Sequence, residues 1–409
     1  MFERNNGRRR TLGEVMQATK NTLSSVYKLG FCLIGDPAVK IAYPEFGMKV
    51  TTVNGQSVDG NSISFKALEK ITVEGEVLDA SGQLVTDFTG IVNPTVKDSK
   101  VTVTCLKNSN KDDSPAFTFT DYPNTIFIGN DSVRNGKFSF TFTVPKDISY
   151  SNLQGKMNLY AVDTESGNEA QGNFDNFIVG GTSDTAETDT IGPEIRALYL
   201  NDTTFVDGGQ VNTTPYFVAE LWDKSGVNIT GSSVGHDMML VIDESTVLSY
   251  NLNSYYELLP GEDGTGIVKF PIPALEPGKH TAEFWVWDIL NNSTVRTFTF
   301  EVVEGLKPFL FDVIATPGIA REQVTFHLMH NRPESRMRVG IMVYDLAGRQ
   351  LWKHEESGTS GLFENYTVSW DLTSGGARMR PGVYIYRAAI STDNSKDATK
   401  ARKFIILGE

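Results

Sequence analysis

The stretch Lys137–Val144, KFSFTFTV, places a large apolar side chain at every second position. Alternate side chains of a β-strand point to opposite faces, so its phenylalanines are predicted to face a core and its polar residues to face solvent. Residues 71–77 and 101–104 alternate in the same way. Turn-forming pairs separate such stretches: Asn54-Gly55, Ser81-Gly82 and Asn135-Gly136. The pattern predicts an antiparallel β-sandwich over residues 46–180.

Two further β units are predicted after a linker at 181–190, whose sequence lacks large apolar residues. The second unit, 191–304, repeats a corner in which a strand ends in Trp-Asp, at Trp222-Asp223 and at Trp287-Asp288. The third unit, 305–409, contains tight turns at 345–348 and 380–382. The fold class is therefore predicted as mainly β, with tandem immunoglobulin-like β-sandwich domains after a short α/β stub at 1–45.

The stub has a different pattern. Thr11 and Glu14 have the spacing of a capping box, which predicts a helix over 11–29 with Gly30 as its C-cap. The apolar run Phe31–Ile34, which contains Cys32, predicts a buried strand. One helix and one strand cannot bury their own apolar faces. We therefore expect 1–45 to be the terminal helix and strand of a larger, truncated α/β domain.

Composition excludes several classes of protein. Two cysteines in 409 residues rule out a disulfide scaffold, and no apolar run is long enough for a transmembrane helix. No apolar segment of a signal peptide follows MFERNNGRRR. The net charge is −13, but residues 306–409 carry 14 Lys+Arg and 11 Asp+Glu, or +3, which leaves −16 for the remainder. This balance argues against nucleic-acid binding and allows the third unit to dock on an acidic surface or a phosphorylated lipid.

Candidate functional residues are few. The local basic excess suggests partner docking through six arginines: Arg332, Arg336, Arg338, Arg378, Arg380 and Arg387. A solvated face is the alternative. Oxygen ligands for calcium could come from the two corners: Asp223, Asn228, Asp288, Asn291 and His236-Asp237. Turn-building is the favoured interpretation of these residues, so we expect no metal and no cofactor. Neither Cys32 nor Cys105 has the sequence context of a nucleophile, and no catalytic residue is predicted.

The sequence also resembles a known family. TLGEVMQATKN (11–21) and FCLIGDPAVKIAYP (31–44) resemble the last helix and strand of the caspase-like domain of gingipain-type cysteine peptidases. Residues 339–352, 368–390 and 400–407 resemble the C-terminal sorting domain of type IX secretion substrates. Residues 189–202, 226–243 and 275–293 are similar to a module of the gingipain-related sortase of that system.

The resemblance implies a function. The parent would be a cell-surface cysteine endopeptidase and transpeptidase that removes sorting domains from cargo and joins the cargo to anionic lipopolysaccharide. Because the family's catalytic histidine and cysteine precede the Gly-Asp-Pro strand, this chain is expected to be an inactive C-terminal fragment. It would position the protease and dock it on outer-membrane β-barrel or shuttle proteins at the cell surface. The parent protein would bind the sorting domains of the cargo.

Two other functions stay open. The chain could be part of a secreted peptidase or adhesin whose sorting domain is cleaved after export. Alternatively, its β units could be carbohydrate-binding modules, with Trp222, Trp285 and Trp287 as candidate contacts. Trp285 and Trp287 share one strand face and are expected instead to pack into a core.

Overall fold

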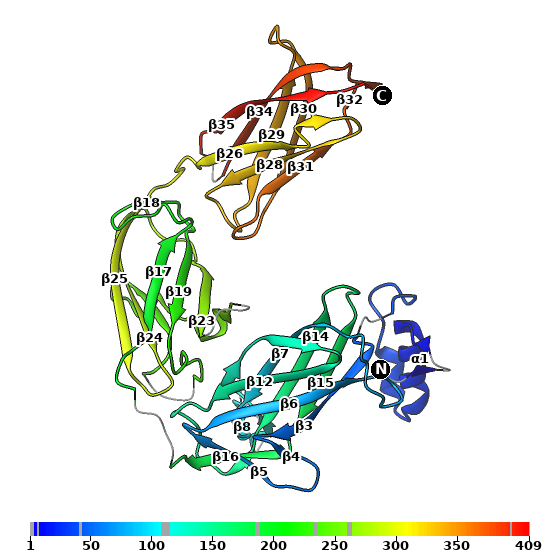
Figure 1. The fold of residues 1–409 in the computed structure, drawn as a ribbon, viewed down its shortest axis with the longest axis vertical. Helices are drawn as coiled ribbons and strands as arrows, with labels where there is room; N and C mark the ends of the chain where they lie inside the picture. Colours follow the sequence, from blue (N-terminus) through cyan, green and yellow to red (C-terminus); the bar gives the residue numbers. More distant parts are fainter. Residues whose placement is uncertain are drawn as a thin grey trace.

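A computed structural model describes residues 4–5, 8–40, 43–107, 115–184, 189–231, 235–259, 264–392 and 395–408. The chain is mainly β, with tandem immunoglobulin-like β-sandwiches that follow one another along an arc (Figure 1). We refer to residues 46–182 as the first sandwich, 194–302 as the second and 310–406 as the third. None of the helices in the described ranges is long and apolar enough to cross a bilayer.

The first sandwich contains the largest sheet. Its strands pair in the order β10-β7-β11-β12-β6-β3-β15-β14, and β14 also pairs with β7, so the sheet wraps around one core. The bounds are β3 Phe46–Val53, β6 Lys70–Leu78, β7 Gly90–Lys97, β10 Thr125–Ile128, β11 Asp131–Arg134, β12 Lys137–Thr143, β14 Lys156–Asp163 and β15 Glu169–Phe174. Strand β4 (Gln56–Ser57) pairs with β3. A second sheet has the order β13-β16-β5, with bounds Leu153–Gln154, Phe177–Thr182 and Ile63–Ala67. Strands β8 (Val101–Thr104) and β9 (Thr118–Asp121) form a separate hairpin.

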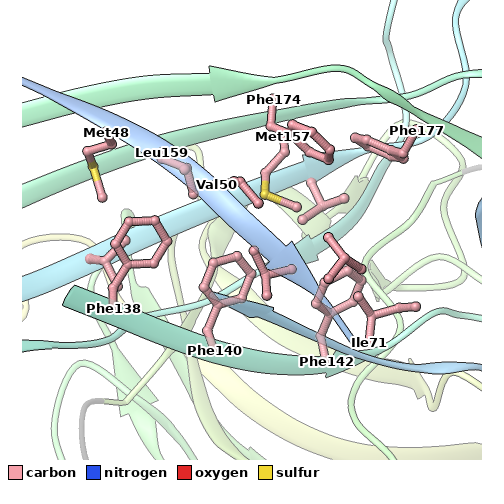
Figure 2. Close-up of a cluster of buried hydrophobic side chains, with 14 of the residues drawn as sticks. Met48, Val50, Ile71, Phe138, Phe140, Phe142, Met157, Leu159, Phe174 and Phe177 are labelled. Atoms are coloured by element: carbon pink, nitrogen blue, oxygen red, sulfur yellow. The ribbon is translucent and has the colours of Figure 1, made fainter. Parts of the chain in front are cut away.

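The alternation of β12 determines where the core lies. Phe138, Phe140 and Phe142 are at most 5% exposed, whereas the intervening Ser139 and Thr141 are exposed. Figure 2 shows the three rings along one side of β12, facing Met157 and Leu159 of β14. Burial of such rings removes a large apolar area from water and is the main favourable term for this sandwich.

The second sandwich packs a four-stranded sheet on a five-stranded sheet. The first has the order β17-β19-β23-β22: Glu194–Leu200, Tyr216–Trp222, Thr265–Pro271 and Tyr256–Leu258. The second has the order β18-β25-β24-β20-β21: Gln210–Val211, Ser293–Val302, Gly278–Trp287, Met239–Ile242 and Ser249–Asn251. A short 3-10 helix, η2, covers Asn253–Tyr255.

Phe284 and Val286 of β24 lie in the core, so Trp285 and Trp287 point outward and are only partly buried. The expectation that these tryptophans pack into a core is therefore wrong, because it assigned the wrong face of the strand to the interior.

The third sandwich packs the sheet β26-β28-β31 on the sheet β27-β35-β34-β29-β30. The bounds of the first are Leu310–Thr316, Val324–His330 and Tyr366–Trp370; those of the second are Ile319–Ala320, Ala398–Ile406, Gly382–Ser391, Met337–Tyr344 and Gln350–Gly358. The hairpin β32 (Thr373–Ser374) and β33 (Ala377–Arg378) lies outside both sheets. The core of the third sandwich contains Phe326, Tyr386 and Phe404, which are fully buried.

The N-terminal segment differs from its prediction. Helix α1 covers only Leu12–Thr22; Thr11 and Glu14 form the predicted capping box, but the C-cap is Leu23 and not Gly30. A 3-10 helix, η1, follows at Val26–Gly30, and short strands β1 (Arg4–Asn5) and β2 (Arg8–Arg9) precede α1. In Figure 1, α1 lies beside the first sandwich.

The predicted buried strand Phe31–Ile34 does not form in the described residues. Phe31 is 63% exposed and Ile34 is 98% exposed, and Cys32 is exposed rather than buried in a core. Leu23, Val26 and Leu29 are exposed as well. The physical reason is that a strand forms only where a neighbouring strand pairs its backbone, and the described part of the chain brings none to this segment.

Candidate docking surface and domain joints

The six arginines predicted to dock a partner do not gather on one surface. Arg338 and Arg387 are exposed on the outward face of the five-stranded sheet of the third sandwich. Three others are exposed outside that sheet: Arg336, Arg378 and Arg380. Arg332 has 0% exposure. A buried guanidinium cannot meet a partner, so its assignment to docking is wrong.

Arg332 instead holds the segment that joins the second and third sandwiches. Its Nη2 donates to the carbonyl oxygens of Leu306 at 3.0 Å and Lys307 at 3.4 Å. Its Nη1 donates to the main-chain and side-chain oxygens of Asn331 at 3.1 and 3.0 Å. The planar fork of arginine suits several fixed oxygens at once. The joint is thus fixed by hydrogen bonds that sequence alone does not reveal.

His330 lies beside this arginine and is kept neutral. Its Nδ1 accepts from the backbone N–H of Arg332 at 3.1 Å, and its Nε2 lies 2.9 Å from the hydroxyl of Ser360. Burial, with the neighbouring Arg332 charge as a smaller cause, lowers the pKa of His330 to about 4. An imidazole that accepts a hydrogen bond at Nδ1 would lose that bond on protonation.

The stability of the third sandwich should therefore depend on pH. The unfolded chain binds a proton at His330 near its ordinary pKa of 6.5, and the folded chain only near pH 4. Stability is present above 6.5 and is lost as the pH falls from 6.5 to 4, by up to about 3 kcal/mol. Urea unfolding followed by tryptophan fluorescence should show this slope, and His330→Gln should abolish it. If His330→Gln keeps the slope while His327→Gln, in the same strand, removes it, the assignment is wrong.

The second and third sandwiches also pack directly. Tyr199, Val218 and Ile267 form an apolar cluster on the four-stranded sheet of the second sandwich, and Leu362 of the third sandwich packs against it. Val218 and Ile267 are almost completely buried. This contact joins residues about 100 to 160 positions apart in the sequence, since Leu362 packs with Ile267 and Tyr199, and no local sequence pattern predicts it.

The first and second sandwiches meet at a partly buried carboxylate. The side chain of Asp147, in the first sandwich, is 11% exposed. Its Oδ2 lies 2.6 Å from Nδ1 of His236 and 3.5 Å from Nδ2 of Asn228, and its Oδ1 accepts from Nδ2 of Asn291 at 2.9 Å. The backbone N–H of Lys146 adds a bond to the carbonyl of Ile289 at 2.8 Å. We call this group the Asp147 joint.

The two Trp-Asp corners bring Asp223 and Asp288 close to Asp189, and carboxylate oxygens of these three residues lie within 4.8 Å of one another. Oδ1 of Asp223 accepts from the backbone N–H groups of Ser225 and Gly226. Oδ1 of Asp288 accepts in the same way from Leu290 and Asn292. These bonds show that both aspartates build turns. Together with Asp189 they also offer oxygen atoms that could hold a metal ion.

The other proposed calcium ligands lie elsewhere. Asn228, Asn291 and His236 face Asp147 in the joint, and Asp237 accepts a hydrogen bond from Nδ2 of Asn253 at 2.8 Å. The sequence did not identify Asp147 or Asp189 as partners of these groups. Both lie outside the predicted corners and reach them only through tertiary contact.

Because three carboxylates lie close together, we expect the chain to become more stable when the charge of Asp223 is removed. Burial, followed by the charges of Asp288 and Asp189, raises the pKa of Asp223 to about 6, against the backbone bonds that lower it. A raised carboxyl pKa means that stability is present below pH 4 and is lost as the pH rises through 6. Asp223→Asn should keep an acceptor for both N–H groups and stabilise the chain at pH 7.5 by about 2 kcal/mol. Thermal unfolding at pH 4 and 7.5 measures the difference.

The matched control is Asp207→Asn in the same sandwich. Backbone and hydroxyl bonds from Thr299 lower the pKa of Asp207, so its charged form is favoured. This variant should lose stability at pH 7.5. Equal effects of the two substitutions would contradict the account.

The cysteines and histidines lie in different regions. Cys32 is in the N-terminal segment and Cys105 follows β8 of the first sandwich; both are free and exposed. All five histidines lie between 236 and 354. Three of them have polar neighbours in their own sandwich: Asp243 for His280, Ser360 for His330 and Glu356 for His354. His236 of the second sandwich instead contacts Asp147 of the first.

The chain is similar in sequence to a protein of known structure. Over its full length the chain is 37% identical to dimeric latent PorU from Porphyromonas gingivalis and covers 39% of that protein, with a TM-score of 0.42. The chain thus spans about two fifths of the length of this relative. This identity supports a PorU-like relation, as the resemblance had predicted.

Other solved structures are similar at low identity. The glucan-utilization protein SGBP-B of Bacteroides ovatus, in complex with a mixed-linkage heptasaccharide, is 9% identical, with 88% of this chain and 71% of that chain covered and a TM-score of 0.25. A tetra-tandem repeat from the extending region of a large adhesion protein is 14% identical, with 89% and 74% covered and a TM-score of 0.19. No family model and no curated protein matches the chain.

Proposed function

We propose that this chain is a non-catalytic positioning and docking region of a gingipain-related cysteine peptidase and sortase of the type IX secretion system. The observation that carries the positioning role is that polar and apolar contacts shielded from water connect the sandwiches at both joints. The 37% identity to latent PorU along the whole chain supports the assignment to this secretion system.

A fixed arm needs joints that resist bending. At the first joint, Asp147 accepts hydrogen bonds from side chains of the second sandwich while it is largely shielded from water. At the second joint, Arg332 binds the connecting segment and Leu362 packs on the neighbouring sheet. Breaking a shielded bond of this kind leaves a charge without partners, which is costly. The three sandwiches would therefore hold a defined distance between their ends.

The N-terminal segment would attach the arm to the peptidase. Val26, Leu29, Phe31 and Ile34 are all more than half exposed. Exposed apolar side chains that are this close together in the sequence favour an interaction site. We propose that this segment completes the caspase-like sheet of the peptidase, which supplies the pairing partner that the described residues do not.

The opposite end of the arm would dock at the outer membrane. The third sandwich carries the net positive part of an otherwise acidic chain. We propose domain boundaries of 1–45, 46–180, 191–304 and 305–409, with a linker at 181–190, a location at the cell surface, and an outer-membrane β-barrel or shuttle protein of the secretion system as the docking partner.

Two measurements on the intact chain test this function. The chain should bind a detergent-purified outer-membrane β-barrel protein of a type IX system in surface plasmon resonance. It should leave a sorting-domain peptide uncut in a fluorescence cleavage assay. Cleavage that disappears in Cys32→Ala would overturn the non-catalytic role, and absence of binding would overturn the docking role.

A further inference from the structure

The docking role proposed above does not say which surface makes the contact, and the structure points to one. We propose that the outward face of the five-stranded sheet of the third sandwich binds an acidic protein surface that carries aliphatic side chains. This inference rests on the proposed docking function. We call the surface the basic–aliphatic face; it consists of Ile319, Ile405, Val383, Lys403, Ile385, Tyr344, Arg387, Met342 and Lys353.

The strand register places these side chains side by side. Ile319 pairs with Ile405, which pairs with Val383 on the next strand. One row further along, Lys403 pairs with Ile385, and Ile385 pairs with Tyr344. Residues directly opposite each other on paired strands share one face of the sheet. The first two rows therefore form a nearly continuous aliphatic patch, with Lys403 at its edge.

The next row supplies most of the charge. Arg387 pairs with Met342, and Met342 pairs with Lys353. Lys353 forms a salt bridge with Glu355 at 2.8 Å. Within the described residues, Arg387 and Lys403 are exposed and form no salt bridge. Two cations without an internal counter-charge, beside exposed aliphatic groups, favour an acidic and partly apolar partner.

The aliphatic residues are exposed to a degree that is unusual on a sheet face. Ile319 is 55% exposed, Val383 41% and Ile385 38%. On the same strand β34, Tyr384 and Tyr386 point inward and are buried. This part of β34 therefore carries apolar side chains on both faces, which is typical of a strand that is covered on both sides.

The shape of the face favours a protein over a bilayer. The exposed aliphatic residues are mostly β-branched and stand on regular strands, which gives a broad surface suited to packing against another sheet or a helix. Interfacial membrane binding instead relies on tryptophan or phenylalanine together with a basic amphipathic segment. The face contains one aromatic residue, Tyr344, and that residue lies only partly exposed in its row.

The test is surface plasmon resonance of the intact chain against the purified outer-membrane β-barrel protein used above. Binding should weaken as salt increases. The double variant R387E/K403E should lose at least tenfold in affinity, whereas K279E/R296E, the same charge change on exposed residues of the second sandwich, should retain it. Ile385→Gln should lose several-fold, and Ile314→Gln, on the opposite sheet of the third sandwich, should not. Circular dichroism and unchanged unfolding midpoints show that each variant is folded.

Each other result overturns a stated claim. If the wild-type chain binds and R387E/K403E binds equally well, the proposed docking function stands and this surface is wrong. If phosphatidylglycerol vesicles without the β-barrel protein bind the chain through Arg387 and Lys403, the partner is a membrane and not a protein. If the wild-type chain binds nothing, the proposed docking function fails, and this inference fails with it.

Discussion

Arg332→Met is expected to destabilise the third sandwich by about 3 to 5 kcal/mol, the cost of disrupting a buried charged group and its partners. The substitution removes the donors that hold the carbonyl oxygens of Leu306 and Lys307 and the oxygens of Asn331. The acceptors of Leu306 and Lys307 lie in the connecting segment and those of Asn331 follow β28, and all would have to be solvated or left unpaired. Urea unfolding followed by tryptophan fluorescence measures the loss.

Arg332→Lys separates charge from geometry. Lysine keeps the positive charge but has no planar fork, so it can hold fewer of these oxygens at once. We expect an intermediate loss of stability. A loss below about 1 kcal/mol in Arg332→Met would mean that the connecting segment is held by other contacts, since surface substitutions have effects of that size.

The second large effect is expected at the other joint. Asp147→Ala removes the acceptor shared by His236, Asn291 and Asn228. The three donors are left without this partner in a site that is largely shielded from water, so we expect a loss of about 2 to 4 kcal/mol and a loosened orientation of the first two sandwiches. Small-angle scattering should show a wider spread of shapes, and limited proteolysis should cut the 181–190 region faster.

Two controls define this result. Asp147→Asn keeps the shape of the side chain and one acceptor, so it should fall between wild type and Asp147→Ala. Asp175→Ala removes an exposed carboxylate from the same sandwich and should change neither scattering nor cleavage. An Asp147→Ala variant that is indistinguishable from Asp175→Ala would show that the first joint is not held by this carboxylate.

Much of the fold could be predicted from local pattern. The alternation in β12, β19, β24 and β34 is strong because one or both faces of these strands are buried, and tight turns separate them. The capping box at Thr11 was identified because both of its partners lie within four residues. Strand β30, Gln350–Gly358, has a weak local signal because it carries charged side chains along an edge of the sheet.

The errors have a common physical cause. The apolar pattern of Phe31–Ile34 is that of a strand, but the pattern does not tell which other strand will pair with it. The local sequence of Arg332 is that of a surface arginine, because its hydrogen bonds to the carbonyl oxygens of residues 306 and 307 form only in the folded chain. Asp147 and Leu362 gain their roles from contacts with other sandwiches. Local sequence predicts strands and turns, whereas the joints depend on residues far apart in the chain.

The central claim is that the three sandwiches form an arm with fixed joints. The most direct test is a distance measured by pulsed electron paramagnetic resonance between two spin labels. The labels are attached through Ser139→Cys in the first sandwich and Thr367→Cys in the third, two exposed strand positions, with Cys32 and Cys105 replaced by serine. The account predicts one narrow distance distribution that broadens in Asp147→Ala and in Arg332→Met. A broad distribution in the otherwise unaltered chain, unchanged by either substitution, would contradict it.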